Sequence, residues 1–473
     1  MQVIIRSFLA ASCLLLWTGC SYSDPATNQQ VAPTRAFKWT PSKLVETPSC
    51  EPHCLAAVDS SHVLTPDELL DIALRNNPQT GQSWHSARAA AYNVTVSQAP
   101  YYPLVTLTET GALFHVSGAG AGSSSSPVPT SGSGSNRELQ SSLSLSYLLL
   151  DFGGRSATVE SARQALAAAN WAHNRTVQTV MISVLTAYYN YAYAIGLVDA
   201  RQQDLHDLAD DLDAARHQLE AGVGTKVDLL QAQANWVNGQ LQLQSAEGLR
   251  DTALGQLALA LGWPANAQFN VVAPPQQLPV DAVSEDVNTL VERAKRERPD
   301  LASAYSAVLQ ARSAVDVAKS AAWPTLGLGG QLARTDFSKG GSLNGQSQGV
   351  ALSLSIPIFT GFLDKYQVAA AREVEEQTYA AWQTAEANAL MDVVTAYYNY
   401  KTAVQNMGYT KQYLDYAQEA YNAALLSYKM GTDSLIDLLN AQETLSDARA
   451  QYVQSRTQFF TAVATISYAV GTL

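Results

Sequence analysis

Proline is absent from two long stretches of this chain, one between Pro129 and Pro264 and the other after Pro357. Helix interiors exclude proline, so both stretches are free to form long helices. Beyond residue 20 the chain also lacks a run of about 18 consecutive apolar residues, and we therefore expect no transmembrane helix in the mature protein. A chain of this kind can cross a membrane only as a closed β-barrel.

The chain has fewer basic than acidic residues, with 29 Lys and Arg and 41 Asp and Glu, which gives a formal net charge of -12. Nucleic-acid-binding proteins cluster Lys and Arg, so this composition argues against nucleic acid as a partner. The seven histidines are scattered, and we find no phosphate-cradling loop, metal-ligand cluster or nucleophile motif. The sequence therefore predicts neither an enzyme nor a cofactor-binding protein.

The amino terminus is typical of an exported protein. An apolar run from Phe8 to Trp17 is too short to span a bilayer, so residues 1–19 are interpreted as a signal peptide. Cys20 follows a small residue and resembles the lipobox cysteine of bacterial lipoproteins, which carries a covalent lipid such as palmitate. Trp17 departs from the small aliphatic residue that this motif prefers. The alternative is cleavage nearby with Cys20 unmodified.

Two further cysteines, Cys50 and Cys54, are separated by three residues within a Pro-rich leader over residues 20–63. Exported proteins meet an oxidising environment, so a local disulfide is the favoured interpretation. A metal site that uses the intervening His53 is the weaker alternative, because no further ligands are nearby.

The rest of the chain contains an internal repeat, in which one unit of sequence occurs twice. Ala-Tyr-Tyr-Asn-Tyr occurs at Ala187–Tyr191 and again at Ala396–Tyr400, and the segment Val227–Gln233 returns as Ile436–Gln442. A repeat of this length must be recognised before any fold is assigned. We expect a first structural repeat, a linker with four prolines and a second repeat, over residues 64–263, 264–284 and 285–473.

Each repeat predicts a very long helix followed by a shorter one. From Arg155 to about Glu220 apolar residues recur at steps of three and four, which is the seam of a coiled coil. About 65 residues at 1.5 Å per residue would reach ~100 Å. Glycine-containing turns end these helices, and return helices follow over about 227–261 and 435–470. The apolar seam of the first repeat is Val177, Met181, Val184, Tyr188, Tyr191, Ile195, Leu205, Leu208, Leu212, Ala215 and Leu219.

Each repeat also predicts one β-hairpin, over residues 104–151 and 325–359. In these segments apolar residues alternate with Ser, Thr, Gly and Gln, as in strands with one apolar face. A soluble sheet could have this pattern, but it also suits strands of an outer-membrane barrel. Four strands cannot close a barrel, so the chain must oligomerise; two copies would pack the interior and three would leave a lumen.

Four motifs are jointly specific: the duplicated Ala-Tyr-Tyr-Asn-Tyr, Asp151-Phe152-Gly153, Phe359-Thr360-Gly361, and the turns from Gly224 to Asp228 and from Gly431 to Asp437. With these motifs the chain resembles the TolC-like outer-membrane efflux channels, in particular their lipid-anchored branch in multidrug efflux. The resemblance covers the chain from about residue 64 onward. It implies a homotrimer with a twelve-stranded transmembrane barrel in outer-membrane lipid and a periplasmic helical barrel. It also implies a passive exit duct for drugs or other small molecules, docked to a periplasmic membrane-fusion adaptor and an inner-membrane efflux pump.

The resemblance also assigns roles at the helical turns. Asp437 matches the first of the acidic residues that ring the periplasmic entrance, and Asn440 occupies the second position. Tyr428 matches a tyrosine that holds the entrance shut, and Asp228 matches its acidic partner. Asp433 stands where some members place an arginine. The alternative for Asp228 and Asp437 is a local role as acids at helix N-termini.

Two other functions remain open from the sequence. The same fold also serves as the outer-membrane channel of type I protein secretion systems. A structural coiled-coil surface protein would explain the long seams, but it would not explain the duplicated amphipathic hairpins.

Overall fold

The computed structural model describes residues 62–116, 134–275, 285–337 and 345–473. Cys20, Cys50 and Cys54 lie outside these ranges, so the predicted signal peptide, lipid anchor and disulfide are not described by the structure.

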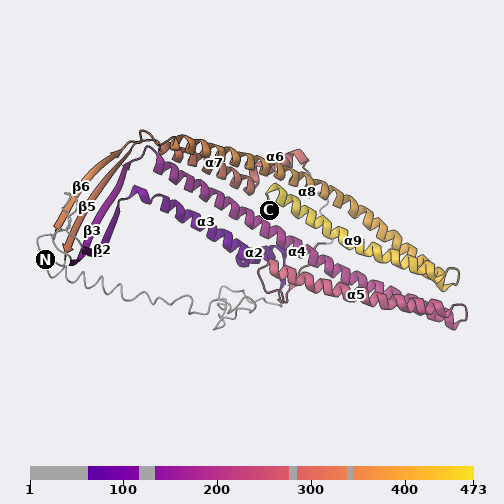
Figure 1. The fold of residues 1–473 in the computed structure, drawn as a ribbon. Helices are drawn as coiled ribbons and strands as arrows, with labels where there is room; N and C mark the ends of the chain where they lie inside the picture. Colours follow the sequence, from indigo (N-terminus) through magenta and orange to yellow (C-terminus); the bar gives the residue numbers. More distant parts are fainter. Residues whose placement is uncertain (1–61, 117–133, 276–284, 338–344) are drawn as a thin grey trace. The chain divides into compact units, whose positions relative to one another are not determined.

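The two predicted hairpins join into one antiparallel sheet of four strands (Figure 1). The first hairpin is β2 (Leu104–Val116) and β3 (Gly134–Leu150), and the second is β5 (Thr325–Phe337) and β6 (Gly345–Ser355). The strand order is β2-β3-β5-β6, so the two repeats meet where β3 pairs with β5. Within the described residues, β2 and β6 each pair on one side only, which leaves two open edges.

The sheet exposes apolar side chains that no described element of the protomer covers. On β6 the alternate residues Val350, Leu352 and Leu354 are 81%, 65% and 62% exposed. Successive side chains of a strand point to opposite faces, so these three share one face. A contiguous apolar face of this kind marks a surface that lipid or another protein covers.

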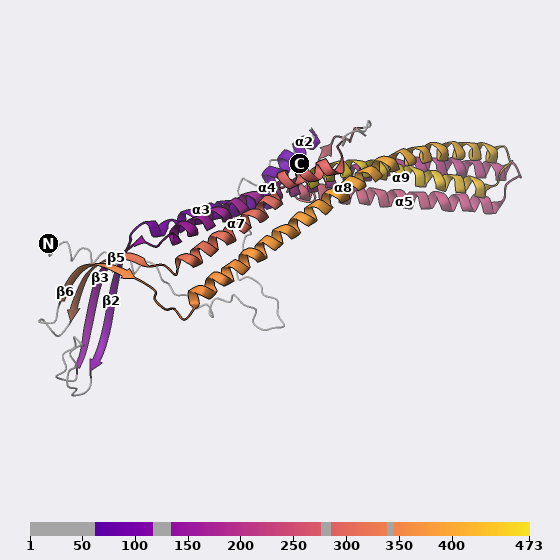
Figure 2. The same ribbon diagram turned by 90° about the horizontal axis from the view of Figure 1, so that it is seen from above.

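Each repeat contains one very long helix, and the two have the same length. α4 (Gly154–Glu220) and α8 (Leu363–Lys429) each contain 67 residues, which corresponds to about 100 Å of helix. Each turns back at a glycine with positive φ, Gly222 or Gly431, into α5 (Lys226–Ala260) or α9 (Leu435–Val470). Figures 1 and 2 show α5 beside α4 and α9 beside α8, and α9 also packs on α4.

Shorter helices precede each hairpin. They are α2 (Pro66–Asn76), α3 (Pro78–Ser97), α6 (Val287–Glu297) and α7 (Pro299–Ser320), with a 3-10 turn η1 (Ala99–Tyr101) after α3. α2 begins with the predicted capping box, in which Thr65 and Glu68 exchange hydrogen bonds. Two short strands, β1 (Val63–Leu64) and β4 (Asn270–Val271), pair in parallel and tie the start of the first repeat to the segment that follows α5.

The duplicated pentapeptide places two tyrosines of each copy in the core, as their spacing predicts, whereas Tyr398 is 57% exposed. Tyr188, Tyr191, Tyr397 and Tyr400 are all buried. The Tyr188 hydroxyl donates to the carbonyl of Val272 at 2.7 Å. Within the described residues, α4 is the one helix that is long and apolar enough to pass as a membrane span by composition alone. Part of α4 packs in a core cluster with α2 and α5, and 22% of the residues in its most apolar stretch are buried.

The strand-to-helix junctions hold clustered aromatic residues. Phe152 and Phe362 have positive φ values of 50° and 66°, which is uncommon for residues other than glycine. The ring of Phe152 stacks on Trp323 at 5.3 Å between centroids, and Phe362 meets Phe359 at 5.6 Å. All four rings are at least half exposed. We call these four residues the aromatic band; they lie where the sheet joins the helices.

Candidate functional site

The residues assigned to an entrance lie at the two helical turns, α4-α5 and α8-α9. α4 begins at the end of β3 and runs 67 residues to its turn, so this turn lies about 100 Å of helix away from the sheet. The same holds for α8 in the second repeat. Figure 2 shows the two turns near one another.

The acids Asp228 and Asp437 each close a capping box. At the start of α5 the Asp228 carboxylate accepts from the backbone N–H and the hydroxyl of Thr225, at 3.0 and 2.7 Å. At the start of α9 the Asp437 carboxylate accepts from the backbone N–H and the hydroxyl of Ser434, at 3.3 and 2.6 Å. The helix-terminus role is thus present at both positions. Asp437 is also exposed to solvent, so its charge remains available to solutes.

The other predicted entrance residues are dispersed around the turns. Tyr428 is buried, and its hydroxyl has no hydrogen-bond partner among the described residues. Burial raises the pKa of Tyr428, and the negative charges of Asp228 and Asp211 raise it further. Asp433 and Asn440 are exposed. Asp228 thus raises the pKa of Tyr428 through its charge, but the structure shows no hydrogen bond between the two side chains.

The predicted apolar seam of α4 is partly polar near the turn. The three leucines of the seam at 205, 208 and 212 are only partly buried, whereas Asp204 and Asp211 are 4% and 1% exposed. The most buried positions of this part of α4 are thus each one residue before a leucine of the predicted seam. Asp204, Asp207 and Asp211 lie on one face, at steps of three and four.

These acids form an ionic cluster with α9. Arg449 on α9 donates through Nη1 to Asp204 at 2.8 Å and to Asp207 at 2.7 Å. Its Nη2 donates to Gln418 of α8 at 3.0 Å. Asp204 also accepts from Arg201 at 3.0 Å and from Ser446 at 2.7 Å. The cluster joins the first repeat to both long helices of the second.

Asp211 lies nearer the turn and is paired differently. It accepts a hydrogen bond from the Tyr421 hydroxyl of α8 at 3.0 Å, and its second oxygen is buried without a partner among the described residues. Burial raises the pKa of Asp211 to about 7, against the hydrogen bond from Tyr421. Burial and the nearby carboxylates likewise raise the pKa of Tyr421. Asp211 therefore changes charge near neutral pH.

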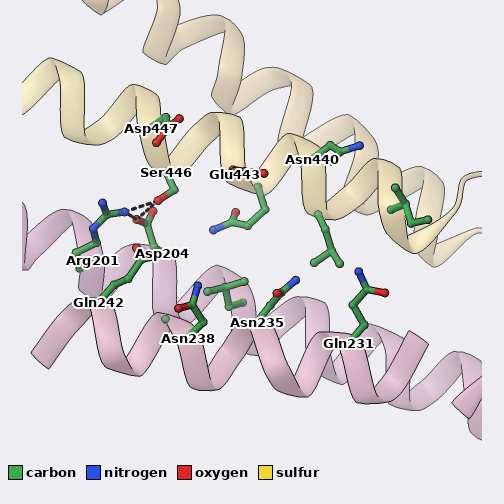
Figure 3. A pocket seen from close by; sticks show the side chains of 15 residues that line it. Arg201, Asp204, Gln231, Asn235, Asn238, Gln242, Asn440, Glu443, Ser446 and Asp447 are labelled. Atoms are coloured by element: carbon green, nitrogen blue, oxygen red, sulfur yellow. Dashed lines mark hydrogen bonds and ion pairs between the residues drawn. The ribbon is translucent and has the colours of Figure 1, made fainter. Parts of the chain in front are cut away.

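A cavity of about 410 Å³ lies between α5 and α9, beside the ionic cluster (Figure 3). Arg201 and Asp204 of α4 line one part of it. Most of the remaining wall is polar and comes from α5 and α9, namely Gln231, Asn235, Asn238, Gln242, Asn440, Gln442, Glu443, Ser446 and Asp447.

The ionic cluster and the cavity were not predicted from the sequence. Their signal was present, because acids interleave with the leucines of α4 and carboxamides replace apolar residues at seam spacing in α5. Acids on a helix are usually a solvated face, however, and the partner Arg449 is 245 residues from Asp204.

Four strands with open edges, joined to two antiparallel pairs of very long helices, define the subunit of an outer-membrane channel with a β domain and a helical barrel. The chain belongs to the outer membrane efflux protein family, whose model matches residues 69–263 and 290–472. The TolC-like assignment and the fold class of a trimeric channel are thereby confirmed. Because this is a family of channels, the expectation of a non-enzyme is confirmed as well.

Individual relatives support this placement. Protein CyaE of Bordetella pertussis is 27% identical over 483 residues, which cover 100% of this chain and 97% of CyaE. Two proteins of Pseudomonas aeruginosa are similar to the chain. The pyoverdine export outer membrane protein OpmQ is 25% identical over 82% of this chain and 81% of OpmQ, and the alkaline protease secretion protein AprF is 26% identical over 70% and 69%. The Campylobacter jejuni CmeC outer membrane channel superposes with a TM-score of 0.73 at 19% identity, covering 86% of this chain and 85% of CmeC.

Proposed function

We propose that this outer-membrane efflux channel is the passive exit duct of a tripartite system that exports small molecules. The observation that carries the proposal is the four-stranded sheet with two open edges and an uncovered apolar face, continuous with two 67-residue helices. Three copies close the edges into twelve strands around a lumen. The long helices then extend the duct toward a periplasmic adaptor and an inner-membrane pump.

The aromatic band at the strand-to-helix junctions fits this placement. Aromatic rings gather at the interfaces of membrane barrels, where an apolar body meets a polar edge. Phe152, Trp323, Phe359 and Phe362 would mark the periplasmic boundary of the lipid. The helical turns then lie in the periplasm and form the entrance.

The entrance residue with the clearest electrostatic role is Asp437. Three exposed carboxylates converging in the trimer would concentrate cations and make the pore prefer them. We expect Asp437→Asn to lower this preference while the capping box persists, because the Asn side-chain oxygen still accepts from Ser434. Planar-bilayer recording under a salt gradient measures the change as a reversal potential closer to zero.

The matched control for that experiment is Asp415→Asn, which removes an exposed acid of α8 that lies before the turn and outside it. It should leave the reversal potential unchanged. If Asp437→Asn also leaves it unchanged, Asp437 is a helix-capping acid and nothing more.

The lipid anchor is the second part of the proposal. Cys20 follows the apolar run and a small residue, as in the acylated cysteine of lipoproteins. We expect Cys20→Ala to abolish incorporation of radiolabelled palmitate, with Cys50→Ala as the matched control that keeps it. Label that persists in Cys20→Ala would show that this cysteine is not the acylated residue.

Protein secretion is the second candidate, and the similarity to AprF favours it. Similarity to OpmQ favours export of small molecules. Deleting the gene in its host separates the two: small-molecule efflux predicts a lower tolerance of drugs with an unchanged set of secreted proteins. The loss of a secreted protein with unchanged drug tolerance would favour secretion.

A further inference from the structure

Gln442 of α9 is buried without the hydrogen bonds that it needs. It is 3% exposed, and neither its side-chain oxygen nor its nitrogen has a hydrogen-bond partner among the described residues. An unsatisfied buried amide costs about 1–3 kcal/mol, so native proteins rarely keep one without a ligand or water. Gln442 lines the cavity between α5 and α9, and a polar occupant of that cavity could reach it.

The facing wall of the cavity presents a line of carboxamides. Gln231, Asn235, Asn238 and Gln242 follow one another on α5 at steps of four, three and four. This is the spacing of a helix seam, which normally carries apolar residues. Figure 3 shows Gln231, Asn235 and Asn238 projecting from α5 toward α9. None of the four forms a side-chain hydrogen bond with another described residue, so these groups are free to hold a ligand.

Two of the carboxylates that line the cavity have no cationic partner among the described residues, so the cavity carries net negative charge. Glu443 and Asp447 line it one helical turn apart on α9, and neither forms an ion pair with a described residue. The one arginine in the lining, Arg201, is engaged with Asp204 at 3.0 Å. Carboxylates and carboxamide oxygens accept hydrogen bonds, so the complementary ligand is a cation with several N–H donors.

We propose that this cavity binds a small aliphatic polyamine. A volume of about 410 Å³ falls in the usual range of small-molecule sites. The ammonium groups pair with Glu443 and Asp447 and donate to the carboxamide oxygens of α5 and of Gln442, while the Gln442 amide nitrogen donates to water held beside the ligand. A bound polyamine thereby bridges the helical hairpin of the first repeat to that of the second, close to both turns.

The test is calorimetric titration of spermidine into the full-length protein in detergent, at about 0.15 M salt to screen diffuse attraction. We expect saturable binding to the wild-type protein. The double variant Glu443→Gln with Asp447→Asn should bind about tenfold more weakly or worse, because two charge-assisted hydrogen bonds are lost. The control double variant, Asp415→Asn with Glu419→Gln, removes two exposed acids of α8 that do not line the cavity and should bind as the wild type does.

A second variant separates a specific site from general attraction. Gln442→Leu keeps the size of the buried side chain and removes its amide, so we expect a folded protein, checked by its melting temperature, with weaker spermidine binding. No saturable binding to the wild type overturns the proposal, as does equal weakening in the control double variant. Displacement of spermidine by Mg²⁺ added at the same total concentration of positive charge would also overturn the proposal, because charge alone would then explain the binding.

Discussion

Arg449→Met should loosen the contact between the two repeats and destabilise the helical region. Arg449 is 11% exposed and lies 2.8 Å from Asp204 and 2.7 Å from Asp207. Removing one partner of a buried ion pair leaves an uncompensated charge and typically costs about 3–5 kcal/mol. Asp204 keeps Arg201 and Ser446 as partners, but Asp207 loses the one ion pair that it forms among the described residues, so the cost falls mainly on Asp207.

Hydrogen exchange of the α4 and α9 amides measures this effect directly. We expect faster exchange around Asp204 and around position 449 in the variant, together with a lower melting temperature. Arg163→Met is the control, because Arg163 pairs with Glu160 in an exposed position, where such pairs are worth little. Unchanged exchange in Arg449→Met would show that the ionic cluster does not hold the repeats together.

The melting temperature should fall as pH rises through about 7, and Asp211→Asn should remove this dependence. The pKa of Asp211 is raised from 3.8 to about 7 in the folded state, so the folded protein holds this proton more tightly than the unfolded chain. The stability that this linkage contributes is complete below 3.8 and is lost as pH rises through 7. Above that pH the ionised carboxylate is buried, and Tyr421 is the one hydrogen-bond donor that its side chain has among the described residues.

The charged groups around Asp211 define the control. Asp207 and Asp210 of α4 raise its pKa, and Lys429 of α8 lowers it. Asp210 is half exposed, so Asp210→Asn should reduce the pH dependence only slightly. Melting curves between about pH 4 and pH 8 decide the matter, because the loss of stability spans the interval between the two pKa values of Asp211. Wild type and Asp211→Asn with parallel pH profiles would contradict a buried, proton-linked carboxyl.

Local chemistry was enough to predict most of the fold. The long helices end where Gly222 and Gly431 permit positive φ, and the four strands lie in the segments where apolar residues alternate. Such segments specify their own secondary structure, because the absence of proline, the capping residues and the spacing of the apolar side chains are all local features of the sequence. The pairing of β3 with β5 joins segments far apart in the chain, and no local pattern specified it.

The functional region was predicted less completely, for a physical reason. Asp228 and Asp437 could be placed at turns because a capping box is a local motif. The burial of Asp204 and Asp211 depends on α8 and α9, which follow more than 150 residues later in the sequence. An acid at a helix seam has the same sequence signature whether water or an arginine faces it. Only the packing of α9 on α4 distinguishes these cases.

The central claim is that each chain supplies four strands to a closed barrel of three copies. The most direct test is the native mass of the full-length protein extracted from the outer membrane in detergent. We predict three protomers per particle, because the open edges of β2 and β6 find partners only in neighbouring copies. A stable monomer or dimer would contradict the account, since neither closes these strands around a lumen.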